Sequence, residues 1–256
     1  METVFDRLEA RAIAVPGVSV RVLERVSSTN DVLLASGTPD VLVAAEEQTA
    51  GRGRRGRRWR SARGAGATFS LARLVARPLR ELPGLSLVAG VAAVRALRSL
   101  GVGAAGLKWP NDIVAGGAKL GGILVETRAA GRGSLAVVGI GINCRRDAAL
   151  ALRLRRRVAA LDSYLGRVDR NAVIAAVARE LVGLLERFER EGLAPIAREW
   201  ELLDALAGSR LRVRLADGRV VTGIAGGLAA DGGLRLRTRA GLRAVHSARV
   251  VSSRPA

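Results

Sequence analysis

Runs of hydrophobic residues up to about residue 206 predict a sheet of short strands together with two long amphipathic helices. The segment 40–45 is almost continuously apolar, which is typical of a buried strand. Apolar residues recur every three or four positions in both helical segments. The predicted strands cover residues 20–26, 40–45, 107–114, 122–127 and 135–143, and the predicted helices cover residues 85–100 and 171–191.

A short polar segment separates the first two predicted strands. Ser28, Thr29 and Asn30 precede an apolar stretch. Residues of these types ahead of a helix commonly serve as N-caps, so capping is the ordinary structural role that we expect for them.

Near Gly208 the pattern changes to short alternating runs that are separated by turn residues. Asp217-Gly218, Asp231-Gly232-Gly233 and Ala240-Gly241 mark the turns. The runs cover residues 211–215, 220–224, 234–237 and 242–245. We therefore expect two domains, a body over residues 1–206 and a small antiparallel barrel over residues 207–256.

Composition narrows the possible functions. The chain has 256 residues, of which 49% are hydrophobic, enough for a substantial core. It contains no run near the ~18 apolar residues of a membrane helix and no signal-peptide profile at its start, so we expect a cytoplasmic protein. One cysteine, Cys144, and one histidine, His246, exclude an intrachain disulfide, a Cys/His zinc site and any catalytic set needing more of these residues.

The net charge of +19 favours anionic partners. Arginine is spread along the chain, however, and aromatic residues, which stack on nucleic-acid bases, make up only 3%. A dedicated nucleic-acid-binding role is therefore disfavoured. Only two of the 42 basic residues are lysines, Lys108 and Lys119, which mark positions where a compact ammonium group suits better than a guanidinium.

The densest chemical signal is the segment 48–59, Gln-Thr-Ala-Gly-Arg-Gly-Arg-Arg-Gly-Arg-Arg-Trp. Gly51 to Gly56 matches the G-x-G-x-x-G pattern of dinucleotide-binding sites. No apolar helix follows, and no acidic residue lies near twenty positions on, so that interpretation fails. Two readings stay open: a flexible loop that closes over an anion, or a solvated basic loop.

Two further segments carry candidate chemistry. Lys108 and Asp112, with Lys119 ahead of Gly121-Gly122, would bring cations, a carboxylate and an accessible backbone together, as phosphoryl or nucleotidyl transfer requires. Packing is the more ordinary role for Trp109 and Pro110. The apolar run 139–142 ends at Asn143, which fits either an adenine edge or a turn, while we expect Cys144 to be a packing residue.

Taken in order, five segments resemble the biotin protein ligase family: Ser28-Thr29-Asn30; Gln48 with the Gly/Arg loop to Trp59; Lys108-Trp109-Pro110-Asn111-Asp112; Lys119 to Glu126; and Gly139 to Asn143. The resemblance implies an α+β fold, with a class II aminoacyl-tRNA synthetase-like mixed sheet flanked by helices and an SH3-like C-terminal β-barrel. It implies that ATP activates biotin as biotinyl-5'-AMP with release of pyrophosphate. Biotin then passes to a lysine of a biotin carboxyl carrier domain of a carboxylase.

The same resemblance assigns roles to individual residues. Lys119, Arg54 and Asp112 are the candidate catalytic residues, and Mg²⁺ is expected to arrive with ATP rather than in a metal site of the chain. The biotin site is expected to comprise Ser28, Thr29, Asn30, Gln48, Arg52, Gly53, Arg54 and Lys119. The ATP site is expected to comprise Arg55, Arg57, Trp59, Lys108, Asn111 and Asn143.

Two departures from the family pattern change the expectations. The Ser-Thr-Asn segment lies about thirty residues from the start, which leaves no room for the DNA-binding winged helix of some members, so we expect no specific DNA binding. Ser247-Ala248-Arg249 stands where the family has Gly-Glu or Gly-Asp.

Two alternatives to a biotin ligase stay open. One is a lipoate or octanoate ligase or transferase of the same fold. The other, with less support, is a non-enzymatic nucleic-acid-binding protein.

Overall fold

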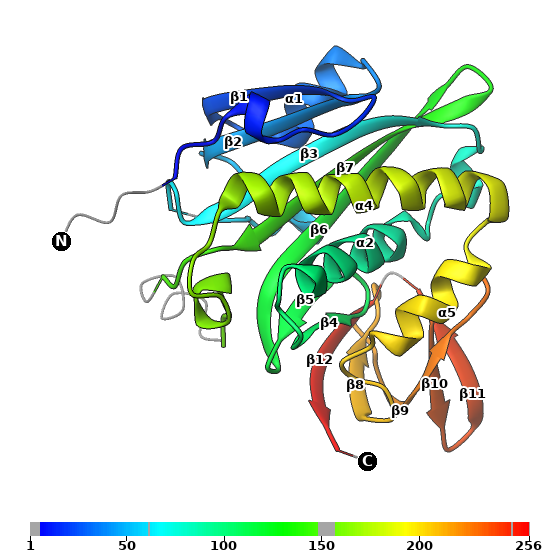
Figure 1. Ribbon diagram of the computed structural model, residues 1–256. Coiled ribbons are helices and arrows are strands. Elements are labelled where there is room, and N and C mark those ends of the chain that lie inside the picture. Colours follow the sequence, from blue (N-terminus) through cyan, green and yellow to red (C-terminus); the bar gives the residue numbers. More distant parts are fainter. Residues whose placement is uncertain (1–5, 61, 148–156, 247, 256) are drawn as a thin grey trace.

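The computed structural model describes residues 6–60, 62–147, 157–246 and 248–255, and its largest element is a seven-stranded mixed sheet (Figure 1). The strand order is β1-β2-β3-β7-β6-β5-β4, in which β1 and β2 are parallel and every other pair is antiparallel. The strands are β1 (Ser19–Val26), β2 (Val41–Gln48), β3 (Gly66–Val75), β4 (Ala105–Lys108), β5 (Asp112–Ala115), β6 (Ala118–Ala130) and β7 (Gly133–Asn143).

Helices cover both faces of this sheet because successive strand residues point to opposite sides. Leu42 belongs to the main core, which includes the apolar faces of the two long helices, whereas Val43 packs with Leu33 of the short helix on the other side. The helices are α1 (Thr29–Ser36), α2 (Leu85–Ser99), α4 (Arg170–Glu191) and α5 (Ala194–Leu202). Figure 1 shows α2 and α4 side by side over one face and α1 behind the sheet near β1 and β2. Single 3-10 turns occur at Ala10–Ala12, Arg54–Gly56, Leu79–Glu81 and Leu161–Ser163.

A separate five-stranded sheet follows α5 and is antiparallel throughout. Its strands, in the order β11-β10-β9-β8-β12, are β8 (Arg210–Arg214), β9 (Val220–Leu228), β10 (Leu234–Thr238), β11 (Gly241–Val245) and β12 (Arg249–Arg254). Its inward residues, such as Leu211 and Leu236, join the main hydrophobic core. The Trp109 indole also donates a hydrogen bond to the Gly232 carbonyl at 3.1 Å, so the small sheet is docked against the β4–β5 turn.

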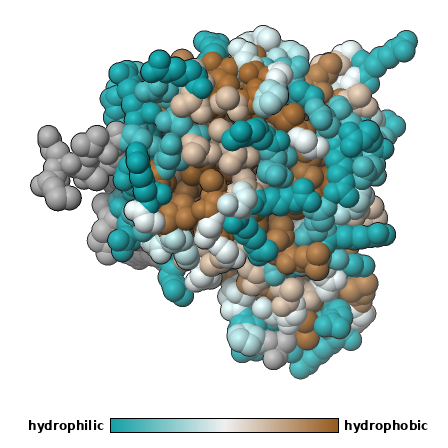
Figure 2. Space-filling model, in the orientation of Figure 1, coloured by the Kyte–Doolittle hydropathy of each residue, from teal (hydrophilic) through white to brown (hydrophobic). Residues whose placement is uncertain are grey.

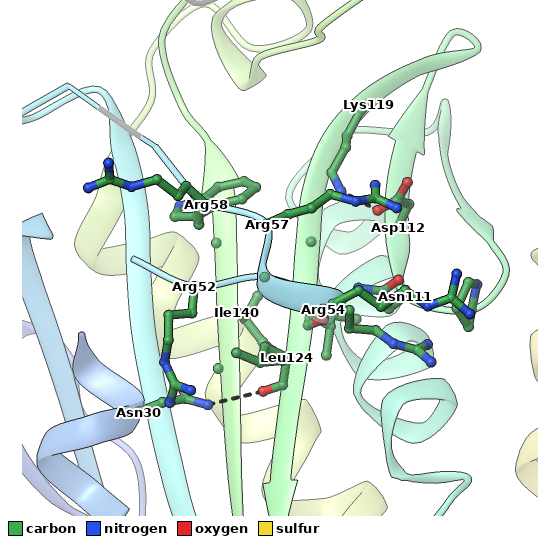
Figure 3. Close-up of a pocket in the computed structure, with 18 of the residues that line it drawn as sticks. Asn30, Arg52, Arg54, Arg57, Arg58, Asn111, Asp112, Lys119, Leu124 and Ile140 are labelled. Carbon is green, nitrogen blue, oxygen red and sulfur yellow. Dashed lines mark hydrogen bonds and ion pairs between the residues drawn. The ribbon is translucent and has the colours of Figure 1, made fainter. Parts of the chain in front are cut away.

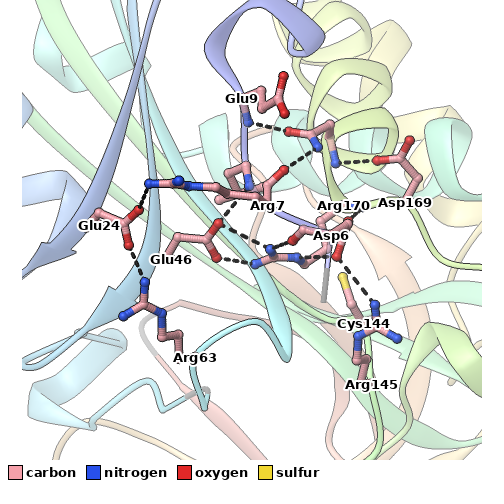
Figure 4. A network of polar contacts seen from close by, with 12 residues as sticks. Asp6, Arg7, Glu9, Glu24, Glu46, Arg63, Cys144, Arg145, Asp169 and Arg170 are labelled. Carbon is pink, nitrogen blue, oxygen red and sulfur yellow. Dashed lines mark hydrogen bonds and ion pairs between the residues drawn. The ribbon is translucent and has the colours of Figure 1, made fainter. Parts of the chain in front are cut away.

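The N-terminal segment is fixed to the body by a buried ion-pair network (Figure 4). The Arg170 side chain is 1% exposed, and its guanidinium lies 2.7 Å from Glu46 and 2.9 Å from Asp6. Glu46 also accepts a hydrogen bond from the Leu8 backbone at 2.6 Å. Because a buried guanidinium is stable only with partners, these contacts hold the start of α4, β2 and the N-terminal segment together.

The hydrophobic pattern located most elements, and one predicted strand was wrong. Residues 107–114 form two strands, β4 and β5, instead of one, with a tight turn at Trp109-Pro110-Asn111 that contains a cis Trp109–Pro110 peptide bond. Alternation alone could not reveal this reversal, because both halves are apolar. The strands β3 and β12 and the helix α5 were not predicted.

The predicted α+β class with a mixed sheet is confirmed, and a separate C-terminal antiparallel sheet is present. No helix within the described ranges is both long and apolar enough to cross a membrane. On the face shown in Figure 2, hydrophobic residues form patches that hydrophilic residues interrupt.

Candidate active site

One pocket collects the segments that the sequence singled out. It lies where the start of α1, the loop 51–59, the β4–β5 turn, the middle of β6 and β7, and the start of β12 meet. In Figure 3 the loop that carries Arg52, Arg54, Arg57 and Arg58 crosses in front of two strands of the large sheet. Residues more than two hundred positions apart thus line the same cavity.

The start of α1 forms a wall of polar side chains. Ser28 occupies the N-cap position, but its side chain accepts no capping hydrogen bond, so capping is not the role of that hydroxyl. Ser28, Thr29 and Asn30 are all buried, at 2–3% exposure, and all line the pocket. Thr29 contacts Gln48 instead: its backbone N–H and its hydroxyl donate to Gln48 Oε1 at 2.8 and 3.1 Å.

A neighbouring hydrogen bond orients the next side chain of the wall. Ser70 on β3 donates to Asn30 Oδ1 at 2.6 Å, and the Asn30 amide donates to Glu126 Oε2 at 2.8 Å. The side-chain amides of Asn30 and Gln48 are therefore held in fixed orientations. With Thr29 they form a neutral wall of hydrogen-bond donors and acceptors, which suits recognition of a polar, uncharged ligand group.

The Gly/Arg segment folds back on itself. The Gly53 N–H donates to the Arg57 carbonyl at 2.7 Å, and the Trp59 N–H donates to the Gly51 carbonyl at 2.8 Å. Arg55 has φ 59°, a left-handed conformation that is uncommon for a residue with a side chain. The segment is thus a short hairpin over the pocket, not the strand-to-helix turn of a dinucleotide site.

Positive charge accumulates under this hairpin. Burial lowers the pKa of the Arg54 guanidinium, repulsion from Arg55 and Arg57 lowers it further, and Asp112 acts in the opposite direction. Cations crowded in a partly buried site favour a bound anion, since an anion would relieve both their repulsion and their loss of hydration.

The β4–β5–β6 region supplies two more cations and a carboxylate. Lys119 on β6 is ion-paired with Asp112 on β5, and the Lys119 side chain is only 16% exposed. Lys108 lies opposite Asp112 in the register of the β4–β5 hairpin. Asn111 donates to the Ile123 carbonyl at 2.7 Å, which holds the turn against β6.

Glycines on β6 and β7 make room for an indole ring. A Cβ on Gly141 would clash with the Trp59 ring, and a Cβ on Gly122 would lie 3.5 Å from it. Trp59 therefore lies against the backbone of these strands. Its Nε1 is buried, and no hydrogen-bond acceptor reaches it within the described part of the chain.

Comparison with known proteins identifies the family to which the chain belongs. Residues 22–143 match the biotin/lipoate A/B protein ligase family, and residues 208–251 match the biotin protein ligase C terminal domain. Over 227 residues the chain is 39% identical to the bifunctional ligase/repressor BirA of Escherichia coli (strain K12), covering 86% of this chain and 70% of that protein. The chain belongs to the biotin protein ligase family.

Two other similarities extend over almost the whole chain. The chain is 32% identical over 237 residues to the biotin--[acetyl-CoA-carboxylase] ligase of Paracoccus denitrificans, covering 90% of this chain and 98% of that one. The biotin protein ligase from Aquifex aeolicus in complex with biotin and ATP superposes with a TM-score of 0.77 at 27% identity, covering 93% and 99% of the two chains. The family is one of enzymes, and the sequence resemblance that we describe above is therefore confirmed.

The structure brings together all but one of the site residues that the resemblance to biotin protein ligases predicted. The residues in the pocket lining are Ser28, Thr29, Asn30, Gln48, Arg52, Gly53, Arg54, Arg55, Arg57, Trp59, Lys108, Asn111, Asp112 and Lys119. Asn143 is the exception. It is 7% exposed and donates to the Ala159 carbonyl at 3.1 Å and the Lys119 carbonyl at 3.4 Å, so its amide fixes the backbone beside β6.

Other pocket residues of this biotin protein ligase fold were missed by sequence reasoning. Gly139 and Gly141 belong to one of the five segments of the resemblance but were given no role, although their spacing of two places them on one face. Arg249 and Ala248 line the pocket from the start of β12. Both belong to the segment Ser247-Ala248-Arg249, which departs from the family pattern, and Ser247 lies outside the described residues. Cys144 is buried, and burial raises its pKa to about 12, which agrees with a packing role.

Proposed function

We propose that this member of the biotin protein ligase family activates biotin with ATP as biotinyl-5'-AMP and then transfers biotin to a lysine of a carrier domain. The observation that carries the proposal is the division of one pocket into a neutral wall and a cationic junction. Thr29, Asn30 and Gln48 form the wall. Arg54 and Lys119 form the junction, where a carboxylate and a phosphate could meet.

In the first step a carboxylate oxygen of biotin attacks the α-phosphorus of ATP, and the bond from that phosphorus to the pyrophosphate oxygen breaks. Both reactants are anions, so the barrier falls only if cations stabilise the charge that gathers at the α-phosphate. We assign this task to Lys119, and we assign to Arg54 the shielding of the acyl-phosphate once it has formed. Arg55, Arg57 and Lys108 would bind the polyphosphate, and Trp59, whose Nε1 has no acceptor among the described residues, would lie on the nucleotide side.

In the second step the amine of the acceptor lysine attacks the acyl carbon, and AMP leaves with the electrons of the acyl–oxygen bond. The amine must lose a proton as the amide forms. Among the described residues that line the pocket, Asp112 supplies the carboxylate, so we assign to it the acceptance of that proton.

Mg²⁺ is expected to bind together with ATP. No cluster of three or more His, Cys, Asp or Glu side chains suited to a metal exists among the described residues. Mg²⁺ is commonly held by one or two carboxylates plus substrate phosphates, and Asp112 beside Asn111 provides such a ligand set. The metal would neutralise phosphate charge.

We further propose that residues 1–206 form the catalytic domain and residues 207–256 an SH3-like domain whose β12 end closes one side of the ATP site. The docking of Trp109 on Gly232 and the position of Arg249 in the pocket support this division of labour. The carrier of a biotin-dependent carboxylase is the proposed acceptor, because the similar protein of Paracoccus denitrificans is a biotin--[acetyl-CoA-carboxylase] ligase.

The experiment that tests the function is ATP–pyrophosphate exchange measured with biotin, with lipoate, with octanoate and without an acid. Exchange should depend on biotin alone among the three acids. Exchange driven by lipoate or octanoate would favour the related lipoate or octanoate chemistry, and no exchange with any acid would overturn the proposal. Biotin attachment to an apo carrier domain, followed by mass spectrometry, tests the second step.

A further inference from the structure

Arg52, the first arginine of the loop over the pocket, is held by two carboxylates. Its Nη2 lies 2.5 Å from Asp31 Oδ1 and 2.8 Å from Glu126 Oε2. Asp31 belongs to α1 and Glu126 to β6, so the arginine ties the loop to two separate elements. Figure 3 shows the Arg52 side chain reaching from the loop to Asn30, the neighbour of Asp31.

The same contacts connect the loop to the polar wall of the pocket. Glu126 Oε2 accepts a hydrogen bond from the Asn30 amide as well as from Arg52. The Arg52 charge is therefore matched within the protein, unlike Arg54, whose pKa is lowered by burial and by neighbouring cations. Arg52 therefore differs from Arg54, Arg55 and Arg57, whose mutual repulsion favours binding of an anion.

We propose that Asp31 and Glu126 are positioning residues that latch the loop over the biotin end of the pocket through Arg52. Closing a glycine-rich loop costs backbone entropy, and a latch made before ligand arrives lowers that cost. The latch thereby slows release of the activated intermediate, which water would otherwise destroy. This inference rests on the proposed adenylation and gives roles to two residues to which the family resemblance assigned none.

The latch can be tested by the rate at which biotinyl-5'-AMP leaves the enzyme, measured with a free-amine trap after ATP and biotin are removed. Because the pairs are half-exposed, we expect Arg52→Ala, Asp31→Asn and Glu126→Gln each to raise that rate about threefold. Salt should raise the rate of the unaltered enzyme and have a weaker effect in Arg52→Ala. Arg52→Lys should restore part of the slow release.

Glu47→Gln is the matched control, because Glu47 pairs with Arg25 on the neighbouring strands at 3.5 Å and lies outside the pocket lining. It should leave release unchanged. Equal release and equal salt dependence in all variants would overturn the latch, even if biotin-dependent pyrophosphate exchange is normal. Loss of that exchange in the unaltered enzyme would instead overturn the proposed function.

A second feature is a row of arginines on the outer face of the small sheet. Arg210, Arg212 and Arg214 on β8 alternate with buried Leu211 and Val213, and they are all exposed. On β12, Arg249 lies opposite Arg214 and Arg254 lies opposite Arg210. Two pairs of like charges therefore face each other across one strand pair.

Like charges directly opposite in a sheet are destabilising, so the row needs an explanation. None of its five arginines forms an ion pair within the described residues, whereas Arg73, Arg95 and Arg187 each pair with two carboxylates. The row also reaches the pocket, because Arg249 lines it. A partner whose lysine enters the pocket beside Arg249 would lie next to this row.

We infer that the row binds an acidic surface of the acceptor protein beside its target lysine. Because this inference depends on the proposed transfer step, the test separates the two half-reactions. Arg210→Glu/Arg212→Glu should raise the KM for an apo carrier domain about tenfold at low salt, with smaller effects at high salt. Biotin-dependent pyrophosphate exchange, which needs no acceptor, should not change.

Arg198→Glu on α5 reverses one charge at an exposed position outside the row, half the charge change of the double variant, and should have little effect. Arg210→Gln/Arg212→Gln provides a milder variant if charge reversal disturbs folding. An unchanged KM in both double variants would overturn the inference. Tight binding of the row to DNA or RNA, lost in the variants while the KM stays constant, would replace the acceptor with a nucleic acid.

Discussion

Lys119 and Asp112, seven positions apart in the sequence, form an ion pair across the β5–β6 hairpin at the pocket wall. The hairpin brings them together because β5 is short and the chain turns at Gly116-Gly117. The candidate for charge stabilisation and the candidate for proton acceptance are thus in direct contact.

Replacement of Lys119 tests the first member of this pair. In Lys119→Ala we expect biotin-dependent pyrophosphate exchange to fall by about a hundredfold to a thousandfold, because the ammonium that stabilises charge at the α-phosphate is gone. Circular dichroism and thermal melting should show an intact fold. Near-normal exchange in Lys119→Ala would contradict the assignment, and Lys119→Arg tests whether a compact ammonium is required.

Removal of Arg54 should affect retention of the intermediate more than its synthesis. We expect Arg54→Gly to release biotinyl-5'-AMP into solution, since a buried cation next to the mixed anhydride is lost and the loop gains flexibility. Nonspecific biotinylation of free amines added to the reaction measures this leakage. Finding no extra labelling, with normal exchange, would rule out the role.

The carboxyl group of Asp204 should make stability depend on pH. Burial, with a smaller contribution from Glu201, raises the pKa of Asp204 to about 6, although the hydrogen bond from the Leu206 N–H acts in the opposite direction. The folded protein then holds the proton more tightly than the unfolded chain, so this stabilisation is complete below about pH 4 and is lost as the pH rises through about 6.

Asp204→Asn keeps an oxygen acceptor for the Leu206 N–H, which now bonds to the carboxylate at 2.9 Å, and removes the charge. At pH 8 we expect it to raise the free energy of unfolding by on the order of 1 kcal/mol, and the gain should disappear toward pH 4. Urea denaturation across this pH range measures it. Asp217→Asn, where hydrogen bonds from Arg219 lower the pKa, should show no such gain.

The buried ion pairs of Arg170, which fix the N-terminal segment to β2 and α4, should contribute strongly to the free energy of unfolding. In Glu46→Gln the Arg170 guanidinium loses one of its two carboxylate partners in a site where it is 1% exposed, so we expect unfolding to become easier by about 3 kcal/mol. Glu24, which pairs with Arg7 and Arg63 at the surface of the same region, provides the control (Figure 4). Glu24→Gln should cost less than about 1 kcal/mol, and equal losses would contradict the argument.

The sequence by itself determined the family and most of the strands and long helices. Five short motifs identify the biotin protein ligase family because each depends on residues adjacent in the chain, and hydrophobic periodicity reports which face of a strand or helix is buried. These are local properties. They predicted the Gly/Arg loop, Lys119 and Asp112 without knowledge of the strand order.

Only the tertiary structure decided which of these residues act together. The contacts of Arg52 with Asp31 and Glu126 join three elements, and Trp59 lies against Gly141, which only the strand arrangement brings near it. Asn143, equally polar, turns instead to the backbone of its neighbours. Side-chain contacts of this kind depend on register and on packing between distant segments, which hydrophobic pattern and motif spacing do not encode.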